Sequence, residues 1–538
     1  MSRQAPSHTQ ILVVGGGPGG SFAASVLAKE GFDVVVLEAA KFPRYHIGES
    51  MLPSIRHFLD LLGAIGKIEN HGFRRKPGAA ICFSASSLLR IEPFPTVFET
   101  NGSEKAILTL ERVIILGTWN VPNSTTYSCN TLRNWASRCT KSTGSPNSRL
   151  PTVPPSQAVP YARHTLSPGR KSIEFDYLID ASGRMGLMST KYMKNRKVNE
   201  SLKNVACWGY WTNTGMYGRG TERHNAPWFE ALTDESGWAW FIPLKGKVSV
   251  GIVMDMTTST AKKAARNTNG ETHTLTDHYL AQLDFVPRLK TLLDGAELVV
   301  DPTGAEPAVR SASDFSYTAT AYYGDHFRLV GDAACFIDPF FSSGVHLAIS
   351  SGLTAAVTIA ASIRGQCTEE EAGGFHDSKI AVSYTRFLLV VMGAYKQIRN
   401  QSDAVLSDID EDNFDRAFDL IRPVIQGTAD VRKVRTEDEM QKAMDFVTNI
   451  FVPTDPEMMQ AVNMRLGMTL LAPATPMFTE DQIAQLAEGD QNAEHVIRQA
   501  NASKAVDFYS GPERLMSEVI NGFIGSTKPG SLGLVRVA

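Results

Sequence analysis

Three glycines near the N-terminus have the spacing of loops that bind phosphate groups. Gly15, Gly17 and Gly20 follow directly on residues 11–14, which are apolar and typical of a strand, and open a small-residue run typical of a helix. Glycines let the backbone approach a pyrophosphate at the helix N-terminus, where free N–H groups and the helix dipole favour anions. Glu38 ends the next strand-like run and would accept a hydrogen bond from an adenosine ribose hydroxyl. The unit predicts a dinucleotide site; a tight turn without a ligand is the alternative.

A second strand-like run, much later in the chain, ends in a similar turn. Residues 328–334 (RLVGDAA) run from an apolar stretch into Gly331 and Asp332. NAD and FAD both fit the first unit. In flavoproteins of the two-dinucleotide type, a second segment of this kind returns to the cofactor, and its acid binds the ribityl chain. Asp332 therefore favours FAD, while the simpler interpretation is a turn with a helix N-cap.

Further segments resemble the flavin-dependent halogenases, most closely the free-standing fungal enzymes that halogenate phenolic polyketides. The similar segments are residues 43–53 (PRYHIGESMLP), 76–80 (KPGAA), 238–243 (WAWFIP), 336–344 (FIDPFFSSG) and 406–427 (LSDIDEDNFDRAFDLIRPVIQG). Residues 238–243 fit the WxWxIP signature of that family. A flavin hydroxylase would share the glycine turn and the Gly-Asp pair, but not the tryptophan pair together with Lys76.

The resemblance implies a reaction in which reduced FAD and O2 oxidise a halide, with chloride as co-substrate, to hypohalous acid. A halide needs oriented N–H donors in a dry site, and the resemblance assigns this role to the backbone amides of Ser343 and Gly344. A helix N-cap, the other interpretation of these residues, uses the same free N–H groups. The resemblance also places Arg44 among the cofactor-binding residues.

Lys76 is the residue that the resemblance identifies as the carrier of the halogen. Hypohalous acid is small and indiscriminate, so a selective enzyme must hold it beside one aromatic carbon. The Lys76 amine could form a chloramine or donate a hydrogen bond that makes chlorine more electrophilic, and burial would favour the neutral amine. Lys76 follows Arg74 and Arg75, so a solvated basic face is the alternative.

The tryptophan pair indicates how the two reactants are kept apart. Trp238 and Trp240 project to the same face if their run is a strand. The resemblance implies that they line the site between flavin and substrate and suppress hydroxylation; core packing is the alternative. Relatives that act on tryptophan carry Glu two residues before the Ser/Thr-Gly of the halide loop, where this chain has Phe341. This difference favours an activated, phenolic substrate over an indole.

The elements that must position these residues predict an α/β fold. We expect a two-dinucleotide-type, Rossmann-like FAD-binding domain, a mixed-sheet substrate region and a helical C-terminal region. The expected elements are a helix at 21–30, strands at 33–37, 177–179 and 327–330, β structure over 238–253, and helices at 411–422 and 480–499. The expected units are 1–111 with the first βαβ unit and Lys76, 112–173, 174–368 with the rest of the FAD-binding and substrate sheets, and 369–538.

Residues 112–173 form an anomalous segment without a single Asp or Glu, rich in Ser, Thr, Asn, Pro and Arg. The resemblance stops after residues 119–121, with Asn123 where the family carries an Arg, and resumes at residues 175–184 (FDYLIDASGR). The composition is typical of a disordered surface insertion. A shifted reading frame or a misplaced exon boundary is our hypothesis. It is wrong if neither other frame of the coding DNA encodes an Arg-Ser-Glu helix.

Two alternative functions follow from these observations. One is a flavin-dependent aromatic hydroxylase (monooxygenase), which would make an oxygenated product without chloride. The other is an inactive or folding-defective halogenase relative, because the anomalous segment replaces a packing layer of the family. The sequence shows no second NAD(P)H-binding unit, so the expected partners are a separate flavin reductase and a small phenolic substrate.

Composition narrows the remaining classes. The chain has 538 residues, with 53 Lys and Arg against 56 Asp and Glu, so a nucleic-acid partner is not expected. Six scattered cysteines with no CxxC motif favour free thiols and no metal site. The N-terminus is polar and its first apolar run, residues 11–14, is too short for a signal sequence, so we expect no export. Residues 339–363 are long and apolar enough for a membrane span, but their place after the halide loop predicts a buried helix. We expect a cytoplasmic protein without a membrane partner.

Overall fold

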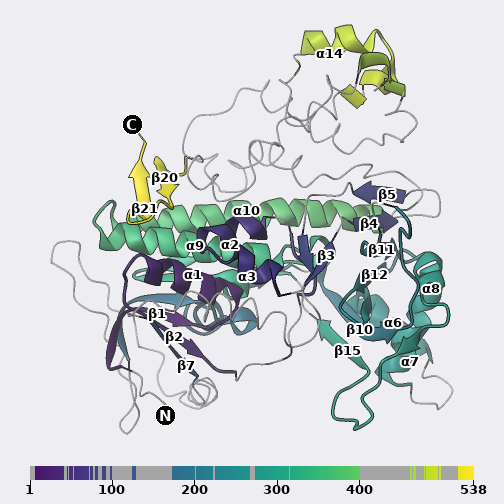
Figure 1. The fold of residues 1–538 in the computed structure, drawn as a ribbon, viewed down its shortest axis with the longest axis horizontal. Helices are drawn as coiled ribbons and strands as arrows, with labels where there is room; N and C mark the ends of the chain where they lie inside the picture. The colour runs from purple at the N-terminus through teal and green to yellow at the C-terminus, as the bar shows by residue number, and fades with distance from the viewer. Residues whose placement is uncertain are drawn as a thin grey trace.

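The computed structural model describes most of the chain between residues 6 and 399 and parts of its C-terminal region. The described residues are 6–40, 45, 48–52, 54–71, 73–76, 79–82, 88–91, 97–99, 124–128, 173–199, 202–221, 224–266, 273–313, 316–399, 401, 461–462, 464–467, 478, 480–494, 496–497 and 519–537. A pair of long helices runs across the molecule, with one large sheet below its left part and a second at its right end (Figure 1).

The first sheet is the expected Rossmann-like unit. In spatial order its strands are β17 (Tyr323–Gly324), β18 (Phe327–Leu329), β8 (Glu174–Asp180), β1 (His8–Val14), β2 (Val34–Glu38) and β7 (Ser124–Ser128). All neighbours pair parallel except β17 and β18. Carboxyl ends of parallel strands meet at one edge. The glycine loop after β1, Glu38 and the Gly331-Asp332 turn after β18 therefore share that edge.

The expected helix after the glycine loop is present and begins earlier than predicted. Helix α1 (Pro18–Lys29) starts with Pro at its first position, where the missing N–H costs nothing. It packs against α9 (Gly344–Ile363), which also packs against α10 (Glu369–Ile398). In the described part of the chain, α9 is the helix that has the length and hydropathy of a membrane span, and 78% of that window is buried inside the protein. The prediction of a buried helix here is confirmed.

The second sheet carries the tryptophan pair. Its strands are, in spatial order, β14 (Glu297–Leu298), β10 (Asn204–Thr212), β13 (Val248–Asp255), β12 (Gly237–Pro243), β11 (Trp228–Ala231), β4 (Ala79–Cys82) and β5 (Leu88–Ile91), with β15 (Val309–Ser313) also on β10. Residues 238–253 thus form the antiparallel pair β12 and β13, as expected. This sheet is mixed, because β11 and β4 pair parallel.

Side chains of the second sheet divide between two faces. Odd-numbered apolar residues of β10 and β12 pack with residues of α7 (Leu275–Gln282) and α8 (Pro287–Leu292), near α6 (Met256–Arg266). Even-numbered aromatic residues lie on the other face, towards the middle of the molecule. They are Trp208, Tyr210, Trp238 and Trp240.

Short elements complete the described fold. The remaining helices and strands are α2 (Ile55–Leu61), α3 (Ile65–Glu69), β3 (Arg74–Lys76), β6 (Val97–Glu99), β9 (Arg196–Val198), β16 (Tyr317–Ala319) and β19 (Cys335–Phe336), and the single-turn segments η1 (Gly183–Met185), η2 (Leu187–Tyr192), η5 (Leu283–Phe285), η6 (Gly331–Ala333) and η7 (Pro339–Phe341). Strand β3 pairs antiparallel with β6 in a separate two-stranded sheet, and Lys76 ends β3 just before β4.

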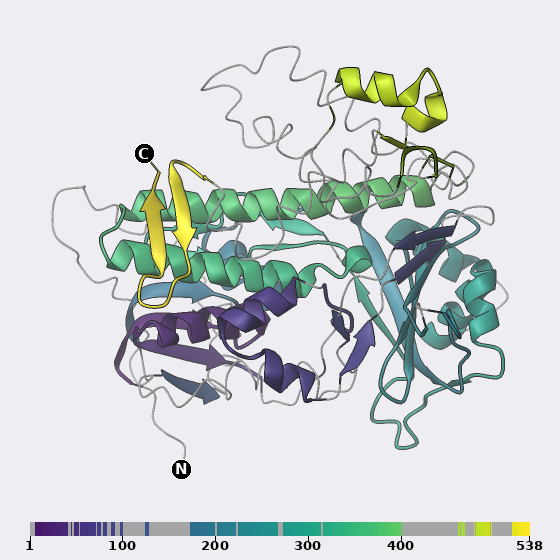
Figure 2. The same cartoon turned by 45° about the horizontal axis from the view of Figure 1, so that its top comes forward.

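The C-terminal region is helical in α10 and α14 (Glu480–Ala487), as predicted, but it does not end in helix. Strands β20 (Phe523–Ser526) and β21 (Gly533–Arg536) form a hairpin against α9 (Figures 1 and 2). Glu30 at the end of α1 holds this hairpin, accepting hydrogen bonds from the backbone N–H of Gly530 and from Arg364. These contacts join segments that are far apart in the sequence. The predicted helix at 411–422 lies outside the described residues.

Within the anomalous segment the structure describes residues 124–128 and 173. Strand β7 is the edge strand of the first sheet, with Ser124 opposite Val34 and Ser128 opposite Glu38. A part of this segment therefore occupies a regular position beside the predicted FAD-binding unit. The reading-frame hypothesis stays a hypothesis, and the other residues of 112–173 lie outside the described part.

A buried ion pair joins the first sheet to α10. Arg328 on β18 is fully buried, and its Nη1 donates to Glu369 Oε1 at 2.6 Å. Its Nε donates to Thr358 Oγ1 of α9 at 3.2 Å. Because a guanidinium is always charged, the buried cation depends on these acceptors. The pair fixes the strand that leads into Gly331 and Asp332.

Replacing Glu369 with Ala should lower the free energy of unfolding by about 3 kcal/mol, because Arg328 is then buried without its carboxylate. Chemical denaturation of the purified protein measures this change. The control is Glu370→Ala at the exposed neighbouring position, which should change the value by less than about 0.5 kcal/mol. Equal effects of the two variants would contradict the assigned role of the ion pair.

Candidate active site

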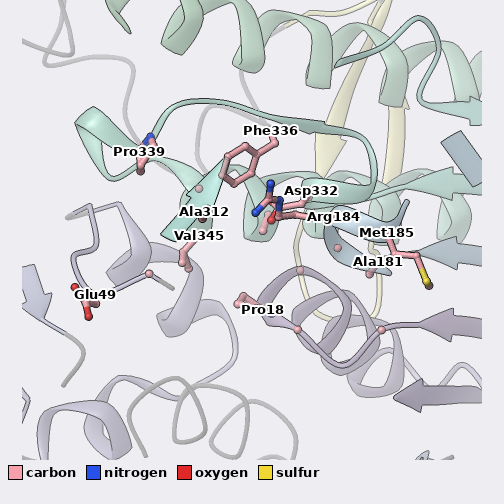
Figure 3. A pocket seen from close by; sticks show the side chains of 18 of the residues that line it. Pro18, Glu49, Ala181, Arg184, Met185, Ala312, Asp332, Phe336, Pro339 and Val345 are labelled. Atoms are coloured by element: carbon pink, nitrogen blue, oxygen red, sulfur yellow. The ribbon is translucent and has the colours of Figure 1, made fainter. Parts of the chain in front are cut away.

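One long cavity of about 1130 Å³ connects most of the predicted site residues. Figure 3 shows it passing from Ala181 and Met185, beside the glycine loop, past Asp332 and Phe336 to Glu49. Of the predicted site residues, those that line it are Gly15, Gly17, Gly20, Glu38, Trp238, Trp240, Asp332 and Gly344. Lys76 and Ser343 lie just behind the wall, as described below, and Arg44 lies outside the described residues.

The glycine loop at one end of the cavity is shaped for a ligand. Gly15 has φ +108°, and a Cβ there would overlap the carbonyl oxygen of Ala181, so only glycine fits. A Cβ on Gly17 would meet nothing within 4 Å and would stand in the cavity. The N-terminus of α1 receives no side-chain cap. This is the open, N–H-rich cradle that a pyrophosphate requires.

Glu38 has a structural role beside its predicted one. Its Oε2 accepts from the backbone N–H of Gly16 and its Oε1 from that of Ala40, both at 2.7 Å. The carboxylate therefore fixes the glycine loop while it lines the cavity. Its second lone pairs are available to a ribose hydroxyl.

Asp332 lies in the middle of the cavity, in η6, directly after β18. Burial raises the pKa of Asp332 to about 6, and the nearby cations Arg184 and Arg196 partly oppose this rise. Arg184 also lines the cavity, with its guanidinium carbon 5.5 Å from the centre of the Phe336 ring. Burial makes the charged carboxylate less stable here, so it is suited to accept hydrogen bonds from ligand hydroxyls. Together with the glycine loop, these residues fit an extended flavin dinucleotide.

The predicted halide loop enters the cavity at the N-terminus of α9. Ser342 has φ +58°, an uncommon conformation outside glycine. Ser343 is fully buried at the N-cap position, and its Oγ has no hydrogen-bond partner among the residues that the structure describes. A Cβ on Gly344, which lines the cavity, would meet nothing within 4 Å. An uncapped helix start with open space in front of it has the electrostatic properties that favour an anion.

Lys76 is connected to this loop through one serine. Its side chain is 8% exposed, and its Nζ donates to Ser50 Oγ at 2.6 Å. Ser342 Oγ donates to the same Ser50 oxygen at 3.2 Å. The alternative of a solvated basic face is wrong for Lys76. The lysine is instead held beside the loop that the sequence assigns to the halide.

Trp238 is part of the core as well as of the cavity wall. Its side chain is 2% exposed and packs edge-on against Phe340, with ring centres 4.8 Å apart. Its Nε1 donates to Tyr395 Oη of α10 at 2.9 Å, and that hydroxyl donates to Asp338 Oδ2 at 2.7 Å. Burial raises the pKa of Asp338 to about 6. This buried network fixes the plane of the indole.

Trp240 is the more accessible member of the pair and lies 5.8 Å from Trp238, centre to centre. Its ring lies over Gly251 of β13, where a Cβ would overlap the indole. Trp208 of β10 flanks it at 6.4 Å. The predicted common face of Trp238 and Trp240 is confirmed, and both interpretations apply, since the two rings are packed and also line the cavity.

Several cavity residues were not assigned roles from the sequence. They are Tyr45, Glu49, Ser50, Arg184, Trp208 and Arg310 in the wall, and Tyr210, Asp338 and Tyr395 behind it. The alternating aromatic residues of 208–211 (WGYW) are a signal that could have identified Trp208 and Tyr210. The other residues reach the cavity because segments that are distant in the sequence pack together. The spacing of residues in the sequence does not predict such contacts.

In the FAD-free protein, Asp332→Asn should raise the free energy of unfolding at neutral pH by about 1–2 kcal/mol, the shift being reduced by water in the cavity. The pKa of about 6 in the folded protein lies above the ordinary Asp value of 3.8. Wild type therefore loses stability as pH rises from about 3.8 to about 6, and the difference in stability between the two proteins should vanish below that range.

The same variant should retain FAD at least about tenfold less well. Denaturation across pH and flavin absorbance measure the two effects; unchanged FAD retention would contradict the role of Asp332.

Comparisons with known proteins agree with this geometry. The family model for tryptophan halogenase matches residues 10–83 and 161–452, and the unmatched residues between overlap the anomalous segment. The flavin-dependent halogenase armH4 of Armillaria mellea is 51% identical over the full length of both chains. The sulochrin halogenase gedL of Aspergillus terreus is 40% identical, covering 99% of this chain and 94% of its own.

Among solved structures, the myxobacterial chondrochloren halogenase CndH, described as a variant of FAD-dependent halogenases, has the same fold. The TM-score is 0.57 at 23% identity, covering 83% of this chain and 98% of that one. The α/β fold with a Rossmann-like unit is thus confirmed. By the family match and by its relatives along the whole chain, this protein belongs to the flavin-dependent halogenases, an oxidoreductase family that works with FAD.

Proposed function

We propose that this enzyme uses reduced FAD, O2 and chloride to chlorinate an electron-rich phenolic ring in secondary-metabolite biosynthesis. The observation that carries the proposal is the single cavity that joins the glycine loop, Asp332 and the start of α9 at Gly344. Lys76 lies beside that helix start through Ser50. This supports a cofactor and a halide that share one cavity, with the proposed halogen carrier just behind its wall.

Bound reduced FAD, with O2, supplies the oxidising equivalents that turn chloride into hypochlorous acid. The residues of the chain do the rest. The N–H groups at the start of α9 hold chloride, and Phe229, Trp238 and Phe340 form an apolar cluster with ring centres 4.8 to 6.2 Å apart. This cluster limits water, which strengthens the electrostatic contacts inside. Lys76 then holds the chlorine as a chloramine or by a hydrogen bond.

A phenol is the preferred substrate class because its oxygen activates the ring by itself. At the position of Glu in relatives that act on tryptophan, this chain has Phe341, whose ring packs on Phe340 at 4.9 Å between centres. An apolar ring cannot accept a proton from an indole. The relative gedL is, by its name, a halogenase of sulochrin, which supports a substrate other than tryptophan.

We also propose that a separate flavin reductase supplies the reduced cofactor, because the sequence has no second NAD(P)H-binding unit. We propose a cytoplasmic location because the cysteines that the structure describes are free thiols. In the described part of the chain, Cys82, Cys207, Cys335 and Cys367 are free thiols, which suits a reducing compartment.

Lys76→Ala should reduce the formation of chlorinated phenol by roughly 10³-fold or more, since the halogen carrier is lost, while chloride-dependent oxidation of the flavin continues. Product mass and chlorine isotope pattern, measured with FAD, a reductase, NADH and a resorcylic phenol, give the result. The control is Lys67→Ala on the exposed side of α3. A hydroxylated product that needs no chloride and survives Lys76→Ala would support the hydroxylase alternative. Purified protein without flavin or activity would support the inactive relative.

Gly344→Ala should raise the chloride KM about tenfold, because the added methyl group stands in the open space before α9 and costs about one N–H contact. FAD content should not change. Gly66→Ala in α3, where a Cβ also meets nothing within 4 Å, is the matched control. An unchanged chloride KM in Gly344→Ala would place the halide elsewhere.

A further inference from the structure

Glu49 lies in the cavity wall, apart from the residues at the glycine loop (Figure 3). It follows β2 in the chain but faces the aromatic side of the second sheet, where its Oε1 accepts from Tyr210 Oη at 2.8 Å. The next residue, Ser50, accepts from Lys76. Consecutive Cα atoms are about 3.8 Å apart, so Glu49 and the proposed halogen carrier are anchored at one short backbone segment.

Two chains of hydrogen bonds end at the Glu49 carboxylate. Trp208 Nε1 donates to Tyr45 Oη at 2.9 Å, and Tyr45 Oη lies 3.1 Å from Tyr210 Oη. Tyr210 uses its single proton on Glu49, so Tyr45 donates to Tyr210. The direction of this chain is therefore fixed, and every donor in it points towards the carboxylate.

The second chain comes from the tryptophan pair. Trp240 Nε1 donates to Ser249 Oγ at 3.0 Å, and the Ser249 hydroxyl is hydrogen-bonded to Glu49. A carboxylate offers about four acceptor sites, and these two chains occupy two of them. Among the described residues, these two chains leave acceptor positions on the Glu49 carboxyl group, whose side chain lines the cavity.

The charges around Glu49 make it a usable base. Burial raises the pKa of Glu49, while hydrogen bonds from Ser249 and Tyr210 and the cations Lys247 and Arg310 oppose that rise. Lys247 Nζ lies 3.6 Å from the centre of the Tyr210 ring, and the Arg310 guanidinium carbon lies 4.7 Å from that of Tyr45. Burial also raises the pKa of both tyrosines, so neither competes with Glu49 for the role of anion.

We propose that Glu49 binds the hydroxyl group of the phenolic substrate and takes its proton, which makes Glu49 the base of the chlorination step. This inference rests on the proposed function and adds the residue that recognises the phenol. Trp208 and Trp240 line the same cavity as Glu49, and both indoles are fixed in orientation through the chains that end on Glu49.

In the form in which Lys76 holds hypochlorous acid by a hydrogen bond, the substrate O–H proton moves to Glu49 while a ring carbon forms a bond to chlorine. The Cl–O bond of hypochlorous acid breaks, and its electron pair leaves with the oxygen as hydroxide. Hydroxide then takes the proton from the chlorinated ring carbon and becomes water. The released pair restores the aromatic ring, and the phenol oxygen recovers its proton from Glu49.

The decisive experiment compares wild type with Glu49→Gln, which keeps the size and an acceptor oxygen for Tyr210 but cannot take a proton. Chlorination of a phenol at neutral pH should fall about 10²–10³-fold. Chloride-dependent flavin oxidation and bound FAD should not change, and a free thioether trap should collect the unused hypochlorous acid. The loss should shrink with more acidic fluorinated phenols and at higher pH, where the substrate arrives as phenolate.

The control is Glu297→Gln, which removes the same charge at an exposed position of β14 in the same sheet. A variant that is merely misfolded would lose FAD, and Ser249→Ala then provides the second test. It releases Trp240 but keeps the base, so its deficit should not depend on the acidity of the phenol. Equal loss with all phenols in Glu49→Gln, or no loss, would overturn the inference. Absence of any chlorinated product from wild type would overturn the proposed function itself.

Discussion

The close packing of α1 against α9 is the constraint on which the site depends. A Cβ on Gly19 of α1 would lie 2.6 Å from the carbonyl oxygen of Ala348, and a Cβ on Gly352 would lie 2.6 Å from that of Gly19. The two helix backbones therefore touch with no side chain between them. Because the helices meet so closely near their first turns, the loops at Gly17 and Gly344 open into one cavity. Two positive helix ends thus face the same space, one suited to a pyrophosphate and the other to a halide.

The second requirement is a rigid wall on the side of the substrate. Two indoles in that wall donate their N–H to a hydroxyl that is itself hydrogen-bonded to a carboxylate: Trp238 through Tyr395 to Asp338, and Trp240 through Ser249 to Glu49. Buried carboxylates are costly unless they are fully hydrogen-bonded. The hydrogen bonds that stabilise the buried carboxylates also fix the orientation of the indole rings. The same contacts therefore support both the stability of the core and the shape of the site.

The anomalous segment contacts the predicted cofactor-binding unit through strand β7. Strand β7 pairs with β2 over its whole length, and β2 ends at Glu38, which holds the glycine loop through Gly16. The family model leaves residues 84–160 unmatched, while curated relatives align along the full chain. The edge beside the predicted cofactor site is therefore built from the part of the sequence that differs most from the family pattern.

Features that depend on the spacing of nearby residues could be predicted from the amino-acid sequence. The βαβ unit at Gly15, the Gly-Asp turn at Asp332 and the common face of Trp238 and Trp240 follow from strand and helix periodicity, which the chain expresses over a few residues. The tertiary structure alone decided what depends on contacts between distant segments. It buried Lys76 beside Ser50 and Ser342, gave Trp238 a partner on α10, placed a C-terminal hairpin against α9 and directed two hydrogen-bond chains to Glu49. In the sequence, a lysine that follows two arginines is typical of a solvated basic surface. Only the packing of other segments around it can show that it is enclosed.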